Sequence, residues 1–136
     1  MKPMDELIIP DDLLFGSNHE WIRRENGHAR VGISDYAQDQ LGEIVFAELP
    51  QVGDTFKKDD AFATIESVKT VSELYMPVSV EIIEVNDAIG DAPDLINQSP
   101  YEKGWLIVIR PSAPEEFDTL MTAGEYIGKI KEPDSQ

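Results

Sequence analysis

The chain of 136 residues contains no cysteine. It therefore cannot form a disulfide, a thiol nucleophile, a cysteine-ligated zinc site or an iron–sulfur cluster. Its 2 histidines are too few for a histidine-rich metal site. The composition thus excludes most redox and metal chemistry that protein side chains carry.

Basic residues are also scarce, because 11 Lys and Arg stand against 27 Asp and Glu, giving a formal net charge of -16. Nucleic-acid phosphates and anionic lipid headgroups would be repelled, so we expect neither kind of partner. The same acidic surface should discourage self-association, and we expect a monomer. Hydrophobic residues make up 41% of the chain, enough for the core of one domain spanning residues 1–136.

Long apolar runs are absent too. No segment approaches the roughly 20 apolar residues of a membrane span. The short run Leu7–Ile9 lacks the length and the basic flank of a secretory signal. We therefore expect a cytoplasmic protein, or a mitochondrial-matrix protein if a presequence has been removed. The N-terminal residues, about 1–9, and the polar tail, about 132–136, are expected to fray.

Short β-strands separated by turns dominate the rest of the chain. The Asn26-Gly27 step between two extended runs predicts a β-hairpin, and Pro, Gly and Asn residues bound the other strands. We expect a mostly β protein closed into a barrel or sandwich. The predicted strands are Trp21–Arg24, Ala29–Ile33, Ile44–Leu49, Ala61–Glu66, Val71–Tyr75, Val80–Val85 and Trp105–Ile109.

Two helices are predicted as well. The first begins after Ser34, a favourable N-cap, and ends at Gly42, because glycine tolerates the positive φ of a helix stop. The second begins at a capping box formed by Ser112 and Glu115 and ends near Gly124, with a last turn or two over residues 125–131.

Lys69 lies at a turn between two of the predicted strands. Strand alternation predicts that its side chain points into solvent, while the flanking Ile65 and Val71 pack inward. A lysine at a turn is most often only a solubilising charge, so its position alone assigns no function.

The residues around Lys69 resemble those of a known family. Glu66-Ser67-Val68-Lys69, followed by Ser-Glu-Leu-Tyr-Met-Pro-Val-Ser at residues 72–79, closely resembles the lipoyl-attachment motif of the glycine cleavage system H protein family. The resemblance runs from about Pro10 to Tyr126. Further matching stretches are residues 19–21, 31–42, 45–50, 84–86, 95–97 and 104–106.

This resemblance implies a lipoyl/biotinyl-type barrel-sandwich hybrid with a short early helix and a C-terminal helix. Lipoate would be joined by an amide to the ε-amine of Lys69, and the lipoylating enzyme would recognise Glu66, Ser67, Val68 and Glu73 around it. The dithiolane of lipoate would carry the sulfur chemistry that a chain without cysteine lacks. The protein is therefore expected to be a carrier and not an enzyme.

The family's reaction cycle also implies partners. A pyridoxal-phosphate glycine decarboxylase, the P protein, would load the aminomethyl group of glycine onto the lipoyl arm. A tetrahydrofolate-dependent aminomethyltransferase, the T protein, would take up the one-carbon unit, and dihydrolipoamide dehydrogenase, the L protein, would reoxidise the arm.

The sequence leaves two alternative functions. The first is a lipoyl relay or stand-alone carrier that supplies lipoate to other enzymes. The second is an enzyme in its own right, but the sequence offers no nucleophile–base pair, metal-ligand set or phosphate-binding loop to support it.

Two glutamates are implied to hold the loaded arm. An amine on a carbon bound to sulfur readily loses that carbon as formaldehyde, and a nearby carboxylate favours the cationic form of the amine. The family pattern assigns this contact to Glu20, in His-Glu-Trp, and to Glu73, four residues after the lysine. The alternative is that both are ordinary surface carboxylates.

Other residues are expected to have structural roles or to depart from the family pattern. We expect His19 to be structural, and Trp21 and Trp105 to fill the core. Val80 and Asp59 stand where the family usually has glycine. A β-branched valine fits a positive-φ turn poorly, unless it is extended and the turn is shifted by a residue.

Overall fold

The computed structural model describes residues 6–131. Residues 1–5 and 132–136, which belong to the segments predicted to fray, lie outside this range. No helix within the described part of the chain is long and apolar enough to cross a membrane. The elements in chain order are β1 (Leu14–Phe15), β2 (Glu20–Glu25), β3 (His28–Ile33), α1 (Asp35–Leu41), β4 (Ile44–Glu48), β5 (Thr55–Phe56), β6 (Ala61–Ser67), β7 (Val71–Tyr75), β8 (Val80–Val85), α2 (Ala88–Asp91), α3 (Leu95–Gln98), β9 (Ile107–Pro111), a 3-10 helix (Pro114–Thr119) and α4 (Ala123–Lys131).

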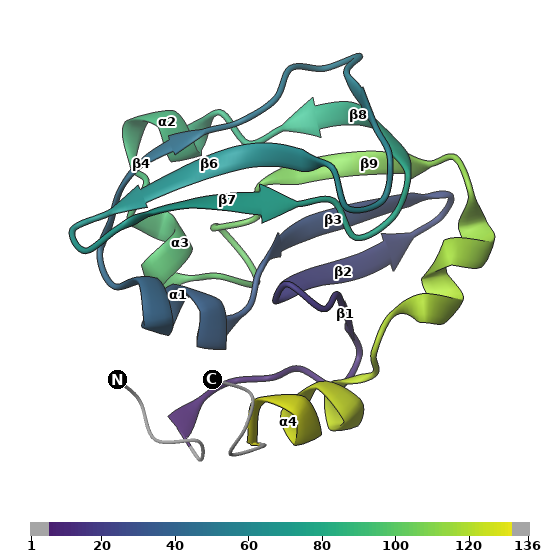
Figure 1. Ribbon diagram of the computed structural model, residues 1–136. Helices are drawn as coiled ribbons and strands as arrows, with labels where there is room; N and C mark the ends of the chain where they lie inside the picture. Colours follow the sequence, from purple (N-terminus) through teal and green to yellow (C-terminus); the bar gives the residue numbers. More distant parts are fainter. Residues whose placement is uncertain (1–5, 132–136) are drawn as a thin grey trace.

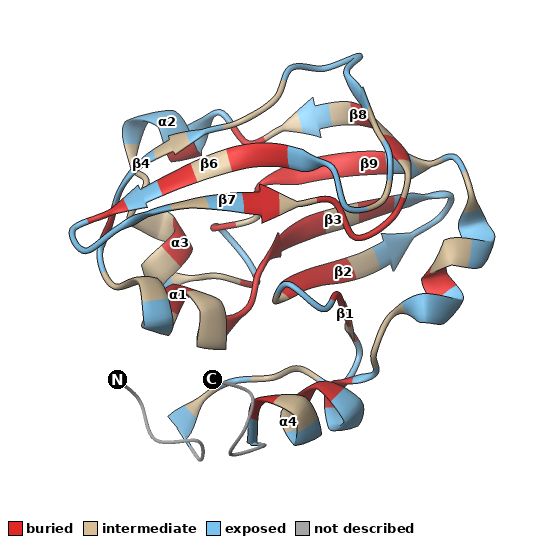
Figure 2. Ribbon diagram, in the orientation of Figure 1, coloured by how far each residue is buried: buried red, intermediate tan, exposed pale blue. Residues whose placement is uncertain are grey.

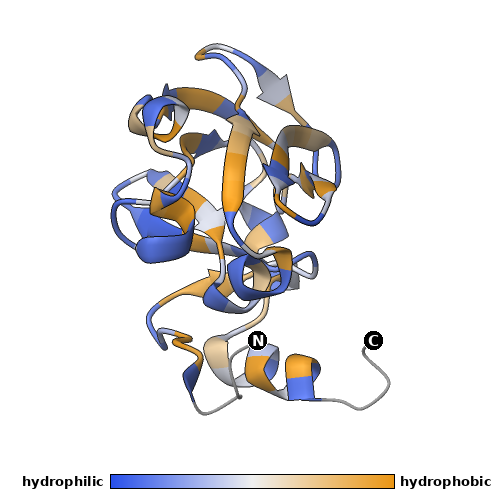
Figure 3. Cartoon of the chain, turned by 90° about the vertical axis from the view of Figure 1, so that its left-hand side faces the viewer, coloured by the Kyte–Doolittle hydropathy of each residue, from blue (hydrophilic) through white to orange (hydrophobic). Residues whose placement is uncertain are grey.

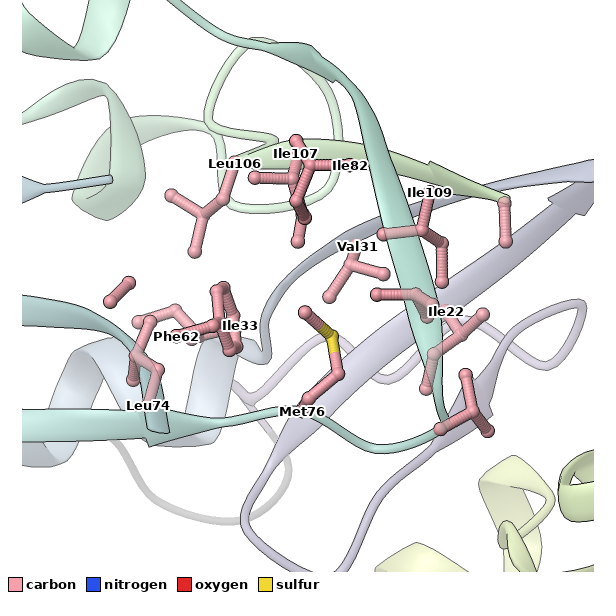
Figure 4. Packing of buried hydrophobic residues seen from close by; sticks show 14 of the residues in the cluster. Ile22, Val31, Ile33, Phe62, Leu74, Met76, Ile82, Leu106, Ile107 and Ile109 are labelled. Atoms are coloured by element: carbon pink, nitrogen blue, oxygen red, sulfur yellow. The ribbon is translucent and has the colours of Figure 1, made fainter. Parts of the chain in front are cut away.

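Two antiparallel sheets form the body of the protein (Figure 1). The larger sheet has the strand order β1-β2-β3-β9-β8-β5, and the smaller has the order β4-β6-β7. Hydrophobic side chains from both sheets meet between them, including Ile33 and Ile82 from the larger sheet and Leu74 from the smaller (Figure 4). Ile65 of the smaller sheet belongs to the same cluster, and Figure 2 shows buried residues along strands of both sheets. The predicted mostly β sandwich is therefore confirmed.

Local sequence signals placed several elements correctly. Asn26 and Gly27 have φ angles of 38° and 85°, as a tight turn between β2 and β3 requires. Ser34 caps α1, because its side chain accepts a hydrogen bond of 3.1 Å from the N–H of Ala37. Gly42 ends the helix with a φ of 81°. Strands β7 and β8 have the predicted bounds, whereas β9 lies two residues further along the chain.

The predicted C-terminal helix is present, but its predicted bounds, from Ser112 to about Gly124, were wrong. The N–H of Ser112 instead donates to the carbonyl of Ser79, which continues the pairing of β8 with β9. A 3-10 helix follows, and α4 begins only at Ala123. The capping box is formed by Thr122 and Glu125, with reciprocal hydrogen bonds of 2.9 and 3.2 Å. The short elements β1, β5, α2 and α3 were not predicted.

A second hydrophobic cluster attaches α4 to the larger sheet. Phe15 of β1 stacks on Tyr126 of α4 with ring centroids 4.5 Å apart, and Trp21 of β2 is fully buried beside them. Leu7 and Ile9 pack against this cluster, so the described part of the N-terminal segment contacts the body of the protein. Trp21 thus fills a core as expected, while Trp105 is only partly buried.

Because Thr122 caps α4 and Ser112 caps no helix, the side chain of Thr122 should stabilise the protein and that of Ser112 should not. We expect Thr122→Ala to lower the free energy of unfolding by about 1 kcal/mol, the usual value of a lost N-cap. Ser112→Ala should change it by less than about 0.5 kcal/mol, because its side chain caps no helix. Urea denaturation of both variants measures the difference. Equal losses would contradict the assignment of the cap to Thr122.

Candidate functional site

Lys69 lies at the exposed turn that joins β6 to β7. Ser67, only 6% exposed, organises this turn from within. Its Oγ accepts hydrogen bonds from the N–H groups of Lys69 and Thr70, at 3.1 and 3.2 Å. The N–H of Ser67 donates to the carbonyl of Thr70 at 2.8 Å. The backbone that carries Lys69 is therefore fixed by one buried hydroxyl group.

The loop between α1 and β4 supports the turn from one side. The N–H of Val68 donates to the carbonyl of Glu43 at 2.9 Å. The methylene groups of Lys69 lie over Gly42, where a Cβ atom would come within 2.7 Å of Cε. Asn97 of α3 holds this loop, because it accepts from the N–H of Ile44 at 2.8 Å and donates to the carbonyl of Gly42 at 2.9 Å.

The sequence did not predict this support for the turn. Gly42 and Asn97 lie in stretches that match the family, but no local pattern indicated that either residue supports the lysine turn. No residue of the described chain forms an ion pair with Lys69, and its amine is open to reaction.

The exposed side of the smaller sheet carries Glu66 and Glu73 of the predicted attachment motif. Glu66 of β6 pairs with Val71 of β7, and both are exposed. Ile65 packs inward as predicted, but the expectation for Val71 was wrong, because it is 62% exposed. The register accounts for the difference: Val71 lies opposite Glu66, whose side chain points away from the core. Glu73 is exposed one row further from the turn, beside Thr64.

Glu20 lies at the start of β2 and is only 1% exposed. It lines a cavity of about 230 Å³ together with Gly16, Lys58, Asp59 and other residues. Burial raises the pKa of its carboxyl group to about 7, an effect that N–H groups of the backbone partly offset. Its Oε2 atom has no hydrogen-bond partner among the described residues. A buried carboxyl group therefore borders the cavity.

Glu73 does not line the cavity of Glu20. It borders a separate hollow of about 300 Å³ on the smaller sheet, together with Glu48, Phe56 and other residues. The structure thus places the two predicted arm contacts beside different hollows, a separation that the motif did not reveal.

Two residues that depart from the family pattern are accommodated by their local backbone. Asp59 has a φ of 76°, the conformation for which glycine is usual, and it borders the Glu20 cavity. Val80 is extended as the first residue of β8 and pairs with Phe56 and Pro111, so it requires no positive φ.

His19 has a structural role beside this cavity. Its Nδ1 atom forms a hydrogen bond of 2.8 Å with the hydroxyl group of Tyr126. Burial, with a smaller effect of Lys129, lowers the pKa of the imidazole to about 4. The ring is therefore neutral at pH 7 and joins β2 to α4.

The two-sheet fold, with a lysine at an exposed and fixed hairpin turn, defines a carrier domain of the lipoyl/biotinyl barrel-sandwich class. The family model described as glycine cleavage H-protein matches residues 13–133. The chain is 52% identical over 126 residues to the glycine cleavage system H protein of Oceanobacillus iheyensis, covering 93% of this chain and 100% of that one. It is 51% identical over 120 residues to that of Bacillus subtilis, covering 88% and 94%.

A solved structure agrees with these sequence relationships. The crystal structure of a glycine cleavage system H protein from Mycobacterium marinum superposes with a TM-score of 0.82 at 41% identity, covering 90% of this chain and 98% of that one. The chain belongs to the glycine cleavage H-protein family. It is thus a non-catalytic carrier component of the glycine cleavage system, in a family that carries lipoate.

The buried carboxyl group of Glu20 should make stability depend on pH. Its pKa is about 7 in the folded protein and near 4.5 when exposed, so the folded state binds the extra proton between these values. The favourable contribution of this extra proton to the free energy of unfolding is complete below about pH 4.5 and is lost as the pH rises through 7. As the pH rises from 4.5 to 7.5, the free energy of unfolding of Glu20→Gln should increase by on the order of 2–3 kcal/mol relative to that of wild type. Urea denaturation across this range measures it, with Glu73→Gln as the exposed control. Parallel pH profiles for Glu20→Gln and wild type would contradict the assignment.

Proposed function

We propose that the chain carries lipoate as an amide on Lys69 and moves the aminomethyl group of glycine between the enzymes of the glycine cleavage system. The observation that carries this proposal is the combination of an exposed lysine amine with a rigid backbone turn. When bound, lipoate supplies the dithiolane, which accepts the transferred group and is then reoxidised. The chain's own residues present, orient and protect that group.

The surroundings of Lys69 fit an acylated amine. Acylation removes the positive charge of lysine, and no described carboxylate loses an ion-pair partner when this happens. Exposed Glu66, Val68 and Glu73 are available for recognition by a lipoylating enzyme. Buried Ser67 would contribute indirectly, by fixing the turn that the enzyme recognises.

Membership of the glycine cleavage system gives the chain the other components of that system as partners. We infer that these are the decarboxylating P protein, the aminomethyl-transferring T protein and the dihydrolipoamide dehydrogenase, together with a lipoylating enzyme. We further infer that the chain is one carrier domain and a monomer. Because relatives from bacteria match almost the whole chain, we also infer a place in the bacterial cytoplasm.

Lys69 should be the only site of lipoylation. Lys69→Arg keeps the positive charge but removes the amine that can be acylated. The variant should fold like wild type, carry no lipoate and be inactive in glycine decarboxylation. Intact mass and peptide mapping after incubation with a lipoylating enzyme provide the measurement. Lipoate on Lys57, Lys58 or Lys103, or full activity of the variant, would refute the proposal.

Glu20 and Glu73 are proposed contacts of the loaded arm, and their surroundings suggest unequal contributions. The carboxyl group of Glu20 is buried and borders a sheltered cavity, where a hydrogen bond that involves a charged group contributes about 1.5–3 kcal/mol. The exposed Glu73 would contribute only about 0–1 kcal/mol. Glu20 should therefore protect a cationic aminomethyl group more effectively.

Glutamine still accepts a hydrogen bond but lacks the charge, so we expect Glu20→Gln to lose about 1 kcal/mol of this stabilisation. The lifetime of the loaded carrier should then shorten about fivefold, and Glu73→Gln should shorten it less than about threefold. The carriers are loaded with labelled glycine through the decarboxylase, and formaldehyde release is followed without the transferase. Both variants are brought to complete lipoylation, checked by intact mass, before they are loaded, because Glu73 is also a proposed recognition residue of the attachment site. Wild-type decay rates in both would show that neither carboxylate protects the cargo.

A further inference from the structure

Exposed hydrophobic side chains gather around the lysine turn. Six large hydrophobic residues are exposed among residues 6–131, and four of them lie on the smaller sheet or on its turn. We call these four the apolar strip, and Figure 3 views the protein from the end where they lie. They are Val45, Phe46, Val68 and Val71, which are 45%, 53%, 64% and 62% exposed.

The strand register places two members of the strip in one row. Phe46 of β4 and Val71 of β7 lie in this row across the sheet, with the exposed Glu66 of β6 between them. The irregularity between Ile44 and Phe46 leaves both Val45 and Phe46 exposed at the edge of that row. Val68 directly precedes Lys69, so the strip reaches the reactive amine.

Core packing does not account for these side chains. The outer face of an antiparallel sheet is normally polar, and the row behind the strip follows that rule with Glu48, Thr64 and Glu73. Groups of exposed apolar side chains commonly mark interaction sites. The smaller sheet therefore presents apolar side chains on both sides of Glu66 beside the turn, and polar and acidic side chains in the row beyond it.

We propose that the apolar strip is the docking surface for the enzyme that acylates Lys69. The proposal rests on the proposed function and names a partner surface for it. Before lipoate is attached, the reacting atom is Nζ of the lysine itself, so the acylating enzyme must cover the turn and Val68. Enzymes that act on the attached arm meet their reacting atoms further from this turn. This proposal requires a complementary surface on the enzyme, apolar where it covers the strip and basic where it meets Glu48 and Glu73.

The test uses the unlipoylated protein and a lipoate–protein ligase with ATP and lipoate. ATP activates lipoate as its adenylate with release of pyrophosphate. Nζ of Lys69 then attacks the lipoyl carbonyl, loses a proton and displaces AMP. Phe46→Thr and Val71→Thr keep side chains that favour strands but remove apolar contact area. Each should raise the KM for the protein substrate about threefold to tenfold, with kcat changed less than about twofold.

Val52→Thr is the matched control. Val52 is 64% exposed, like Val68, but lies between β4 and β5 outside the strip. It should leave KM unchanged, and urea denaturation of all variants checks that they fold equally well. KM values for Phe46→Thr and Val71→Thr equal to that of Val52→Thr would overturn the proposal.

Two further measurements establish which enzyme contacts the apolar strip and which lysine is acylated. A raised KM for the glycine decarboxylase, with an unchanged KM for the ligase, would assign the strip to the decarboxylase and also overturn the proposal. The peptide map tests Lys69 independently: lipoate found on another lysine would refute the proposed function, whereas unchanged KM values with lipoate on Lys69 would refute only the docking surface.

Discussion

The hydrogen bond from the N–H of Val68 to the carbonyl of Glu43 joins the lysine turn to the body of the protein. Without such a bond the hairpin tip would be more mobile, because loop tips make few contacts with the core. Glu43 lies in a short loop whose neighbours Gly42 and Ile44 are both held by Asn97. The backbone of the turn is thus fixed, while the side chain of Lys69 remains flexible. The proposed attachment residue is therefore presented from one defined position.

The buried carboxylate of Glu20 imposes a second constraint. Burying an ionisable group costs free energy unless it is paired, and here one oxygen atom is left without a partner among the described residues. Gly16 has no Cβ, and a Cβ there would overlap the carboxyl group of Glu20, so a larger residue would require that side chain to shift. Asp59 adopts a left-handed conformation at the border of the same cavity. Such costs persist where a structure maintains a site, and here they maintain a polar hollow outside the hydrophobic core.

Local sequence signals determined most of the fold, but they did not determine contacts between distant residues. Asn26-Gly27 is sufficient for its hairpin, because the turn geometry depends on those two residues. Ser112-x-x-Glu115 and Thr122-x-x-Glu125 are equivalent capping boxes in sequence, and only the pairing of Ser112 with Ser79 decides between them. The motif around Lys69 led to the proposal that this residue is the attachment site. It could not indicate that Asn97, 28 positions later, supports the turn, nor that Glu20 and Glu73 border different hollows.

The surface around Lys69 suits a carrier that must also leave each partner. Large apolar interfaces dissociate slowly, and most differences in affinity between related complexes lie in the dissociation rate. A strip of four side chains gives limited apolar contact, and the acidic row of Glu48 and Glu73 adds attraction that acts at a distance. With a formal net charge of -16, the chain would approach basic surfaces quickly without being held there by extensive burial. Fast association and fast release favour a carrier that serves several enzymes, and the acidic surface is available to each of them. The narrow strip is proposed only for the enzyme that acylates Lys69, and its small apolar area favours release of the product.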